Sequence, residues 1–464
     1  MPRYFARMGR RALMRSRARV DRFKLASRAH VRDRLMDDEV IADAVRMHAA
    51  ENGTSQHDAW RRVDGYIREI VPFFNVVAYY QIGYRAAGWL LNLFYKTSVD
   101  FEDARAKERL PRDAVVVYVM NHRSNADYIL VSWALAGQVA ISYAVGEWAR
   151  AFPLELAFKA FGSYFIRRRF REPLYHSVLE RYVQLITREG VTQGIFVEGG
   201  LTRDGKLRAT KIGLLDYVLG IGRDPEFAKR LHVVPVAINY DRVLEDRSLL
   251  LELDQKSGGR RPPRRVQAWE VARYVGWNVT RLLTRRWKRY GRAAVVVGAP
   301  VPLGPWFAEH ADLFALERPE RLAQVQALCD GLLDRVGRLI PVTPVPLVCA
   351  ALQSFDAEFV SRDALIGRIA EMRDALGALN ARVLSTDRGA DEILARAWRM
   401  LKMRRVVAEE GSGFLVLPRG RPLISYYANS VAHLLGPFVD AVQARDALPA
   451  MSGFRRSAPL EALQ

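Results

Sequence analysis

The sequence predicts an α/β fold in which a mixed, largely parallel sheet is flanked by helices, with helical N-terminal and C-terminal regions. Three observations predict it. Short apolar runs alternate with helix-like stretches between residues 114 and 298, an order typical of parallel sheets with helical crossovers. The runs are continuous and rich in Val, as expected of strands buried on both faces. Beyond about residue 310 the strand signals fade and helical patterns dominate.

Six apolar runs predict the strands of this sheet. The first, AVVVYVM at 114–120, is short, continuous and rich in Val. The others are AISYAV at 140–145, SYFIR at 163–167, GIFVE at 194–198, HVVPVAI at 232–238 and AAVVVG at 293–298. Helix-like stretches such as PLYHSVLERYVQLITRE at 173–189 lie between them, and the Gly/Pro-rich segment 256–265 is expected to form a basic loop.

The chain is strongly basic, with 71 Lys and Arg against 51 Asp and Glu in 464 residues and a net charge of +20. This charge predicts attraction to polyanions: nucleic acid, an anionic membrane surface or phosphorylated small molecules. Half of the residues are hydrophobic, so the chain can bury a sizeable core. The two cysteines, Cys329 and Cys349, show neither metal-ligand spacing nor a disulfide framework, which favours a reducing compartment.

The N-terminal part is expected to contact lipid. Its first 34 residues hold 12 Lys and Arg and two acidic residues, with no apolar stretch of the secretory-signal kind. They predict a solvated basic arm or one lying on anionic lipid; a mitochondrial transit peptide fits less well because Ser is scarce. No window offers about 18 uninterrupted apolar residues, so no transmembrane helix is predicted. The aromatic-rich segment 70–95 suits a membrane interface and a buried helix pair equally.

The stretch NHRSNADY at 121–128 directly follows the first predicted strand. Ser124, Asn125 and Asp127 commonly start helices, so a helix is expected to follow. His122 would then sit in the bend at the carboxyl end of a strand, where open α/β sheets bind ligands. His122 and Asp127 can meet only if one lies in the bend and the other in the first helical turn. From spacing alone, a catalytic pair and a capped structural turn both remain open.

Three further stretches sit at strand ends. GSYFIRRRF at 162–170 runs into three arginines, IFVEGGLTRDGKLRATK at 195–211 runs into a Glu-Gly-Gly turn and a basic loop, and VVPVAINYD at 233–241 carries Pro235 within a strand. Each alone has a purely structural interpretation: a solvated cluster, a tight turn, and an edge strand or bulge, respectively.

Together with NHRSNAD, and in this order, these stretches carry a resemblance. The chain resembles the membrane glycerol-3-phosphate acyltransferases, within the wider glycerolipid acyltransferase superfamily. That family has four ordered blocks, H-x4-D, G-x-F-I-R-R, F-x-E-G-x-R-S and a proline-bearing strand. Here they read NHRSNAD, GSYFIRR, FVEGGLTR and VVPVAINY, and the resemblance extends over roughly residues 70–440.

The resemblance implies that His122 is a general base and that Asp127 orients its ring and stabilises the imidazolium. An imidazole, with an ordinary pKa of about 6.5, suits the deprotonation of a hydroxyl that attacks an activated thioester. Backbone N–H groups near the bend or at the Gly199–Gly200 turn are candidates for oxyanion donors. An acyl-enzyme through Ser124 is a less favoured alternative to a helix cap. No metal is required, and no cluster in the sequence predicts a metal site.

The resemblance also implies which residues line the acceptor site, where the planar fork of arginine suits phosphate. These are Arg167 and, close by, Arg168 in the second block, and Glu198, Gly199, Gly200, Thr202 and Arg203 in the third, with Lys206, Arg208 and Lys211 nearby and Pro235 placed near the acyl or acceptor pocket. One position departs from the family pattern. Leu201 stands before Thr202, where the family usually has Arg before Ser, and this suits a more apolar acceptor such as a lysophosphatidate.

We therefore expect an acyltransferase that moves a fatty acyl chain from acyl-CoA or acyl-carrier protein to the sn-1 hydroxyl of glycerol 3-phosphate, the first step of phospholipid synthesis. The runner-up is acylation of lysophosphatidate or another lysolipid. A nucleic-acid-binding protein is a distant alternative, because no zinc finger or aromatic RNA-recognition signature is present. A membrane-surface scaffold with a dead site is disfavoured by the intact His122, Asp127 and Glu198.

The expected enzyme is peripheral or monotopic on the cytoplasmic face of the cell membrane, and binds no cofactor. Four regions are expected: a basic N-terminal arm at 1–50, an aromatic-rich helical membrane-associating region at 51–100, an α/β acyltransferase catalytic domain at 101–310 and a helical C-terminal region at 311–464.

Overall fold

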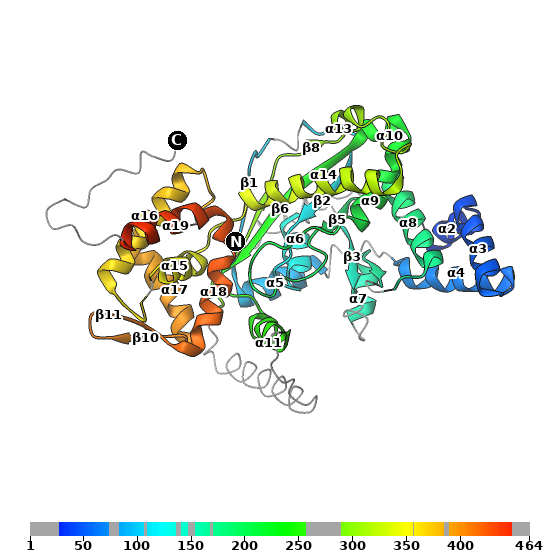
Figure 1. The fold of residues 1–464 in the computed structure, drawn as a ribbon. Coiled ribbons are helices and arrows are strands. Elements are labelled where there is room, and N and C mark those ends of the chain that lie inside the picture. Colours follow the sequence, from blue (N-terminus) through cyan, green and yellow to red (C-terminus); the bar gives the residue numbers. More distant parts are fainter. Residues whose placement is uncertain are drawn as a thin grey trace, which may run out of the picture.

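The computed structural model describes residues 27–73, 83–105, 109–135, 141–146, 154–167, 170–256, 289–355, 357–384 and 389–447. A sheet lies at the centre, with the N-terminal helices (blue) at one end and the C-terminal helices (yellow to red) at the other (Figure 1). The loop predicted at 256–265 falls almost wholly outside the described residues.

The central sheet has eight strands. They are β1 (Lys96–Phe101), β2 (Val115–Met120), β3 (Ser142–Gly146), β4 (Tyr164–Ile166), β5 (Gln193–Phe196), β6 (Leu231–Tyr240), β7 (Arg292–Val297) and β8 (Val301–Pro302). Their order is β1-β7-β6-β2-β5-β3-β4, with β8 also paired to β6. Only β7 and β8 pair antiparallel with β6, and β1 pairs parallel with β7; all other pairings are parallel, so the predicted mixed, largely parallel sheet is confirmed.

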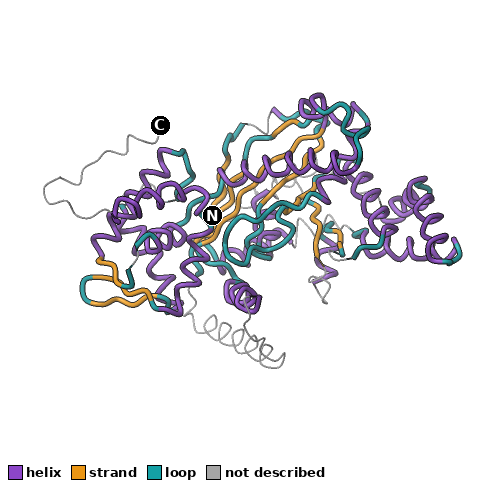
Figure 2. The backbone as a smooth tube through the Cα atoms, in the orientation of Figure 1, coloured by secondary structure: helices purple, strands orange, loops and turns teal. Residues whose placement is uncertain are grey.

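Helices cover both faces of this sheet (Figure 2). The N-terminal helices are α2 (Arg28–Met36), α3 (Glu39–Asn52), α4 (Gln56–Ile70) and α5 (Tyr84–Phe94). Those between the strands are α6 (Asp127–Leu135), α7 (Leu154–Ala160), α8 (Pro173–Arg188), α9 (Gly213–Leu219), the short 3-10 helix η4 (Gly220–Arg223), α10 (Pro225–Arg230) and α11 (Asp246–Lys256). In the part of the chain that the structure describes, no helix is both long and apolar enough to cross a bilayer.

The C-terminal part adds helices and a small second sheet. Its elements are α13 (Gly304–Glu309), α14 (Arg318–Arg338), α15 (Pro344–Gln353), β9 (Phe359–Ser361), α16 (Arg362–Ala378), α17 (Ala390–Arg404), β10 (Val407–Glu410), β11 (Gly413–Val416), the 3-10 helix η5 (Pro418–Gly420), α18 (Arg421–Asn429) and α19 (Ala432–Ala447). The small sheet has the order β10-β11-β9.

Side-chain alternation along β2 divides the core into two layers. Val115, Val117 and Val119 face a layer that contains α8, α9, α14 and the helices α2 to α4. Tyr118 and Met120 face the other layer, which contains α6 and the helices α15 to α18. The strand is buried on both sides, which is why its sequence is apolar without alternation.

The segment assigned to a basic N-terminal arm becomes helical from Arg28 onward. Buried side chains in α2 and α3, among them Val31, Leu35 and Ile41, join the layer formed by α8. Arg181 of α8 also binds Asp38 at the start of α3, with 2.8 Å between Nε and Oδ2. Residues 1–26 lie outside the described part of the chain.

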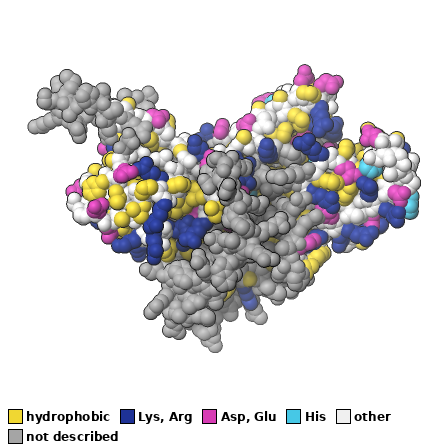
Figure 3. All heavy atoms as spheres, turned by 60° about the horizontal axis from the view of Figure 1, so that its bottom comes forward, with side chains coloured by type: hydrophobic (Ala, Val, Ile, Leu, Met, Phe, Trp, Pro, Cys, Tyr) yellow, Lys and Arg dark blue, Asp and Glu magenta, His cyan; other side chains and the backbone are white. Residues whose placement is uncertain are grey.

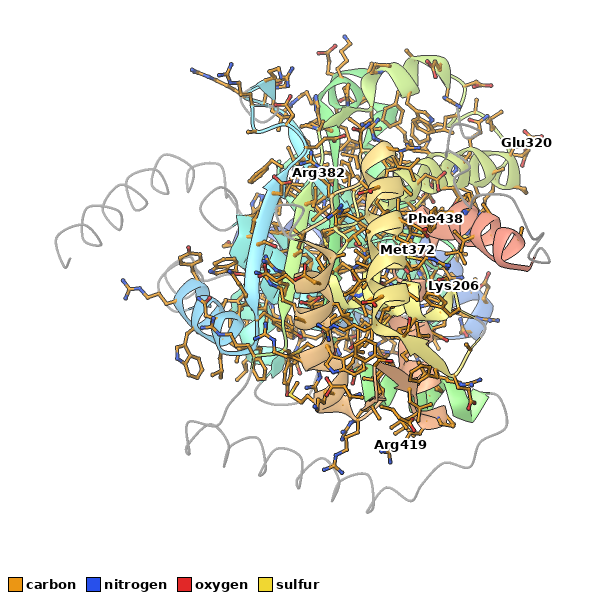
Figure 4. The ribbon with its side chains drawn as sticks, turned by 90° about the vertical axis from the view of Figure 1, so that its left-hand side faces the viewer. Lys206, Glu320, Met372, Arg382, Arg419 and Phe438 are labelled. Carbon is orange, nitrogen blue, oxygen red and sulfur yellow. The ribbon has the colours of Figure 1, made fainter. Side chains whose placement is uncertain are left out.

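The six predicted strands are all present, but β1 was not predicted. Its sequence, KTSVDF, is polar, and its side chains are mostly half-buried because it lies at the edge of the sheet. An edge strand needs no continuous apolar run, so periodicity gives little signal. Arg382 lies beside this strand (Figure 4) and donates from Nη1 to Oδ2 of Asp100 at 2.7 Å.

The expectation that Pro235 marks an edge strand or bulge is wrong in its first part. β6 lies inside the sheet, between β2 and β7. Pro235 falls between the stretch paired to β8 and the stretch paired to β7, and its carbonyl accepts from Gly298 N at 2.8 Å. The missing N–H of Pro235 would point to the same connection, where the ladder is already interrupted.

The C-terminal helices share a core with the sheet. Nine of the ten residues of α15, from Pro344 to Leu352, are buried. The buried carboxylate of Asp241, just after β6, accepts from Val345 N at 3.0 Å and from Arg292 N at 2.7 Å. A second buried carboxylate, Asp246, binds Arg404 of α17, with 2.8 Å between Oδ1 and Nη2. The C-terminal helices are therefore joined to the sheet by polar as well as apolar contacts.

The loop at 199–211 is also held by the C-terminal helices. Gly205 adopts φ +87°, and a Cβ there would collide with the carbonyl oxygen of Tyr426 in α18. Asn429 donates from Nδ2 to Asp204 O at 2.9 Å. Arg123 reaches both sides, donating from Nη1 to Gly205 O and from Nη2 to Ser430 O at 3.1 Å.

We predict that Gly205→Ala lowers the free energy of unfolding by at least about 2 kcal/mol, because both its φ and its contact with Tyr426 exclude a Cβ. Chemical denaturation measures this change. Gly367→Ala in α16 is the control: nothing lies within 4 Å of the added Cβ, and it should stabilise by up to about 1 kcal/mol. Equal stability of the Gly205 variant and the wild type would show that α18 does not approach the loop this closely.

Candidate active site

The stretch at 121–127 forms a bend between β2 and α6. Asn121 fixes its start, because its amide donates to Ile238 O at 2.9 Å and accepts from Ile238 N at 2.8 Å. The carboxyl ends of β2 and β6 are thereby tied together. The bend closes where Asp127 N donates to Ser124 O at 3.0 Å and α6 begins.

His122 and Asp127 meet across this bend. Nδ1 of His122 lies 2.9 Å from Oδ2 of Asp127, and their side chains are 1% and 0% exposed. Oδ2 also accepts from Arg123 N at 2.7 Å and Ser124 N at 3.0 Å. Because a carboxylate only accepts, the geometry assigns the proton to Nδ1 and leaves Nε2 able to take a proton.

The imidazole lies among aromatic rings. Phe196, at the end of β5, stacks on it with 4.0 Å between ring centroids, and Tyr128 meets it edge-on at 5.5 Å. Tyr128 also lines an apolar cavity of about 80 Å³. The cavity's other lining residues are Gly83, Tyr84, Ala87, Ile129, Ser132, Trp133, Ile141, Tyr143, Phe158, Phe161 and Ser163. An apolar space therefore begins one ring away from the imidazole.

Glu198 lies beneath the bend, 1% exposed. Its Oε1 accepts from His122 N and its Oε2 from Arg208 N, both at 2.8 Å. Burial raises the pKa of this carboxyl, and the nearby Arg123 opposes the rise. The structure thus gives Glu198 a positioning role between the bend and the loop at 199–211.

The backbone N–H groups of the bend donate to carboxylates and to a hydroxyl. Those of Arg123 and Ser124 donate to Asp127, and that of Asn125 donates to Glu245 at 3.1 Å. That of Ala126 donates to Oγ of Ser124 at 3.0 Å. With His122 N bound to Glu198, the N–H groups of residues 122–126 are all bound. In the Gly199–Gly200 turn, Gly199 N donates to Phe196 O at 2.9 Å, so Gly200 N remains as a candidate oxyanion donor.

The third block turns at its glycines and then folds back on the bend. Gly199 has φ +64°, and a Cβ there would lie 2.7 Å from Cγ of Lys211. Gly200 is buried beside it. Thr202 is also buried: its N donates to His122 O at 3.3 Å, and its Oγ1 accepts from Gly205 N at 3.1 Å.

The cations of this loop are partly or fully exposed. Arg203 binds Glu252 of α11, with 2.8 Å between Nε and Oε2. Arg208 donates from Nη1 to Leu201 O at 3.3 Å. Lys206 and Lys211 are exposed. The loop therefore brings four cations to the same edge of the sheet as His122.

Other predicted site residues lie elsewhere. Arg167 follows β4, which is three strands from β2, or about 14 Å at the usual strand spacing. Its guanidinium binds both carboxylate oxygens of Glu69 in α4, at 2.8 and 2.5 Å, and lies over the ring of Phe170. Arg168 lies outside the described residues.

The structure does not bring Pro235 to the imidazole. It shares a face of β6 with Val233 and Ala237, which belong to the α14 layer. A Cβ at Gly298 would lie 2.6 Å from both Pro235 Cγ and Leu339 Cδ1, which places the proline ring on that side. The rings around His122 belong to the opposite layer.

Sequence reasoning missed three residues of the site. Tyr240 donates from its hydroxyl to Oδ1 of Asp127 at 2.6 Å. Glu245 accepts from Ser124 Oγ at 2.7 Å, and Arg123 links the bend to the C-terminal helices. Arg123 lies inside NHRSNAD and Tyr240 ends VVPVAINY, so both blocks contained them, but no local pattern indicates their contacts.

The described residues contain no group of three or more His, Cys, Asp or Glu side chains placed to hold a metal ion.

Two parts of the chain match known protein families. Residues 103–239 match the family described as Acyltransferase, and residues 277–437 match the glycerol-3-phosphate acyltransferase C-terminal region. A protein named glycerol-3-phosphate acyltransferase from Aeromonas hydrophila is 29% identical over 448 residues, which is 92% of this chain. In these two regions the chain is similar to glycerol-3-phosphate acyltransferases.

Two further proteins named glycerol-3-phosphate acyltransferase are similar to the same extent. Relatives from Xylella fastidiosa and Xanthomonas axonopodis pv. citri are 28% identical over 88% of this chain. The chain spans about half the length of these curated relatives, between 46% and 52%. The crystal structure of a 1-acyl-sn-glycerophosphate acyltransferase from Thermotoga maritima aligns with 55% of the chain and 76% of its own, at a TM-score of 0.30 and 20% identity.

We predict that Glu198→Gln destabilises the protein by about 1–3 kcal/mol, because an amide nitrogen cannot accept from a backbone N–H and one of the two bonds becomes a clash of donors. Thermal unfolding measures the change. Glu252→Gln, at a carboxylate that is 51% exposed, is the matched control and should change stability by less than about 0.5 kcal/mol. Similar effects of the two substitutions would argue against the buried bridge.

Ser124→Ala separates a structural hydroxyl from a nucleophile. The Ser124 hydroxyl already donates to Glu245 and accepts from Ala126 N, so we expect the variant to lose stability by about 1 kcal/mol and to keep turnover within about tenfold. Turnover with substrate and intact-protein mass spectrometry measure this. Complete loss of turnover, together with a wild-type adduct of acyl mass, would instead support an acyl-enzyme.

Proposed function

We propose that the protein transfers a fatty acyl group from acyl-CoA or acyl-carrier protein to the sn-1 hydroxyl of glycerol 3-phosphate and so forms lysophosphatidate, the first step of phospholipid synthesis. One observation carries this proposal: a buried His–Asp pair with Nε2 able to accept a proton, beside an apolar cavity, in a chain that matches the glycerol-3-phosphate acyltransferase C-terminal region over residues 277–437. The reaction needs no resident metal or cofactor, because the acyl donor is itself an activated thioester.

The proton transfers follow from the His122–Asp127 geometry. Nε2 takes the proton of the acceptor hydroxyl as its oxygen attacks the thioester carbonyl. Asp127, bound to Nδ1, stabilises the imidazolium that forms. When the tetrahedral intermediate collapses, the C–S bond breaks and the imidazolium returns the proton to the leaving thiolate. The oxyanion is assigned to Gly200 N in the Gly199–Gly200 turn, because the N–H groups of residues 122–126 and of Gly199 are already bound.

The apolar cavity is where the acyl chain is expected to lie. Its lining is almost entirely aromatic and aliphatic, and Tyr128 connects it to the imidazole. Burial of a hydrocarbon chain there is favourable by roughly 0.8 kcal/mol per methylene group. This places the thioester carbon next to Nε2 and the rest of the chain between α5 and α6.

The loop at 199–211 is the proposed cradle for the acceptor phosphate, with Arg203, Lys206, Arg208 and Lys211 as cations. Arg167 is a weaker candidate, because Glu69 already neutralises its guanidinium. Leu201, the departure from the family pattern, is half-buried and packs against the core. An apolar residue with that packing reads more simply as a core contact than as part of a lipid acceptor pocket. Glycerol 3-phosphate therefore stays ahead of lysophosphatidate as the acceptor.

The proposal places the enzyme on the anionic cytoplasmic face of the cell membrane, as a peripheral or monotopic protein. Exposed apolar side chains lie on two helices that contribute to the cavity lining: Tyr84 and Trp89 of α5 are 42% and 66% exposed, and Leu156 of α7 is 50% exposed. A net charge of +20 favours anionic lipid. Figure 3 shows Lys and Arg side chains interspersed with Asp and Glu on the described parts of the visible face.

An acceptor competition tests the function. The purified protein in anionic vesicles receives one acyl-CoA with equimolar glycerol 3-phosphate and a lysophosphatidate whose acyl chain differs in length from that of the acyl-CoA, and mass spectrometry identifies the products. We expect lysophosphatidate to form from glycerol 3-phosphate. His122→Ala should reduce the rate at least about 100-fold with folding intact. Phosphatidate formed only from the supplied lysophosphatidate would favour the lysolipid alternative, and absence of product even with acyl-carrier protein as donor would overturn the proposal.

A further inference from the structure

We propose that Tyr240 is the third member of the His122–Asp127 pair: a positioning residue whose hydroxyl fixes the Asp127 carboxylate and tunes its hold on the imidazole. The proposal rests on the function proposed above. It adds a residue that acts through Asp127 and that is anchored by the C-terminal helices.

The geometry places one tyrosine on one carboxylate oxygen. The Tyr240 hydroxyl donates to Oδ1 of Asp127 at 2.6 Å, and both side chains are fully buried. The other oxygen, Oδ2, receives His122 and two backbone N–H groups. Within the described residues, Tyr240 is the donor that the structure gives to Oδ1. A hydroxyl-to-carboxylate bond of this length is typical of a charge-assisted bond.

Tyr240 remains a donor at working pH. Burial and the neighbouring Asp127 charge raise the pKa of its phenol well above the ordinary value. The hydroxyl therefore stabilises the charge of Asp127 without competing for it. The hydrogen bond from Tyr240 lowers the basicity of the Asp127 carboxylate and so weakens its attraction for the imidazolium. The strength of the His122 contact thus depends on a residue more than 100 positions away in the sequence.

The segment after Tyr240 explains how this ring is held. Its neighbour Asp241 accepts from Val345 N at the start of α15. Val243 N donates to the Tyr427 hydroxyl at 3.1 Å, and that hydroxyl donates to Asp246 at 2.9 Å. The Tyr240 ring itself packs against Tyr95, with 5.3 Å between centroids. The C-terminal helices therefore fix the residue that fixes Asp127.

Other charged and titratable groups surround the pair. Glu198 faces His122 from the end of β5, and Glu245 lies near Asp127 on the segment after β6. Arg123 comes from the bend itself, and Tyr426 faces Asp127 from α18. These groups are common to the wild type and to the variants below, so a difference between variants reports the Tyr240 hydroxyl.

The test is Tyr240→Phe, with Tyr95→Phe as matched control. Each removes one buried hydroxyl, but that of Tyr95 donates to Arg242 O at 2.8 Å and not to Asp127. We expect Tyr240→Phe to lower kcat about tenfold with KM values within about twofold, and to move the acid limb of the pH–rate profile to higher pH. The limb moves up because a less stabilised carboxylate holds the imidazolium more tightly. In an Asp127→Asn background the same change should have no further effect on kcat.

A second measurement does not depend on activity. In protein labelled with ¹⁵N-histidine, the His122 signal is assigned by its absence in His122→Ala, and its titration is followed by NMR. Tyr240→Phe should raise the midpoint by about half a pH unit, and Tyr95→Phe should leave it in place. Equal midpoints in both variants and the wild type would overturn the proposal whether or not turnover is detected. An inactive wild type with the expected NMR shift would instead refute only the proposed function.

Discussion

The rest of the structure depends on the hydrogen bonds that the buried carboxylate of Asp127 accepts. It accepts four hydrogen bonds, from the His122 ring, two backbone N–H groups and the Tyr240 hydroxyl. A charge with no exposure to water is tolerated only when such donors surround it. The bend, the end of β6 and the start of α6 must all be in place to supply them. The sheet must therefore be correctly folded for Asp127 to hold His122 in the geometry of a general base.

The bend is stabilised by acidic side chains rather than by regular secondary structure. Asp127, Glu198 and Glu245 together satisfy N–H groups that a strand or helix would otherwise bind. Burial raises the pKa of Glu198 and of Glu245, because desolvation disfavours the charged form of each carboxyl. Arg123, 2% exposed, supplies nearby positive charge and is itself bound to carbonyls of the loop and of α18. The arrangement keeps the backbone rigid while leaving Nε2 of His122 for chemistry.

The sequence predicted those features that depend on residues close together in the chain. Strands such as β2 are buried on both faces and so read as continuous Val-rich runs, and the strand–bend–helix context located His122 and Asp127. The polar edge strand β1 gave no comparable signal. Contacts between distant segments could not be read at all: Arg167 with Glu69 and Tyr240 with Asp127 are 98 and 113 positions apart. The shared core of sheet and C-terminal helices likewise has no signature in periodicity.

Because Gly205 lies so close to the carbonyl of Tyr426, two distant parts of the chain constrain each other's sequence. The loop at 199–211 and helix α18, more than 200 positions later, pack so closely at Gly205 that no Cβ fits between them. A change in the sequence or length of either segment would disrupt its packing against the other. Recombining an α/β segment from one relative with the C-terminal helices of another would therefore join surfaces that have not been selected together. The part that carries the chemistry is not a transferable module.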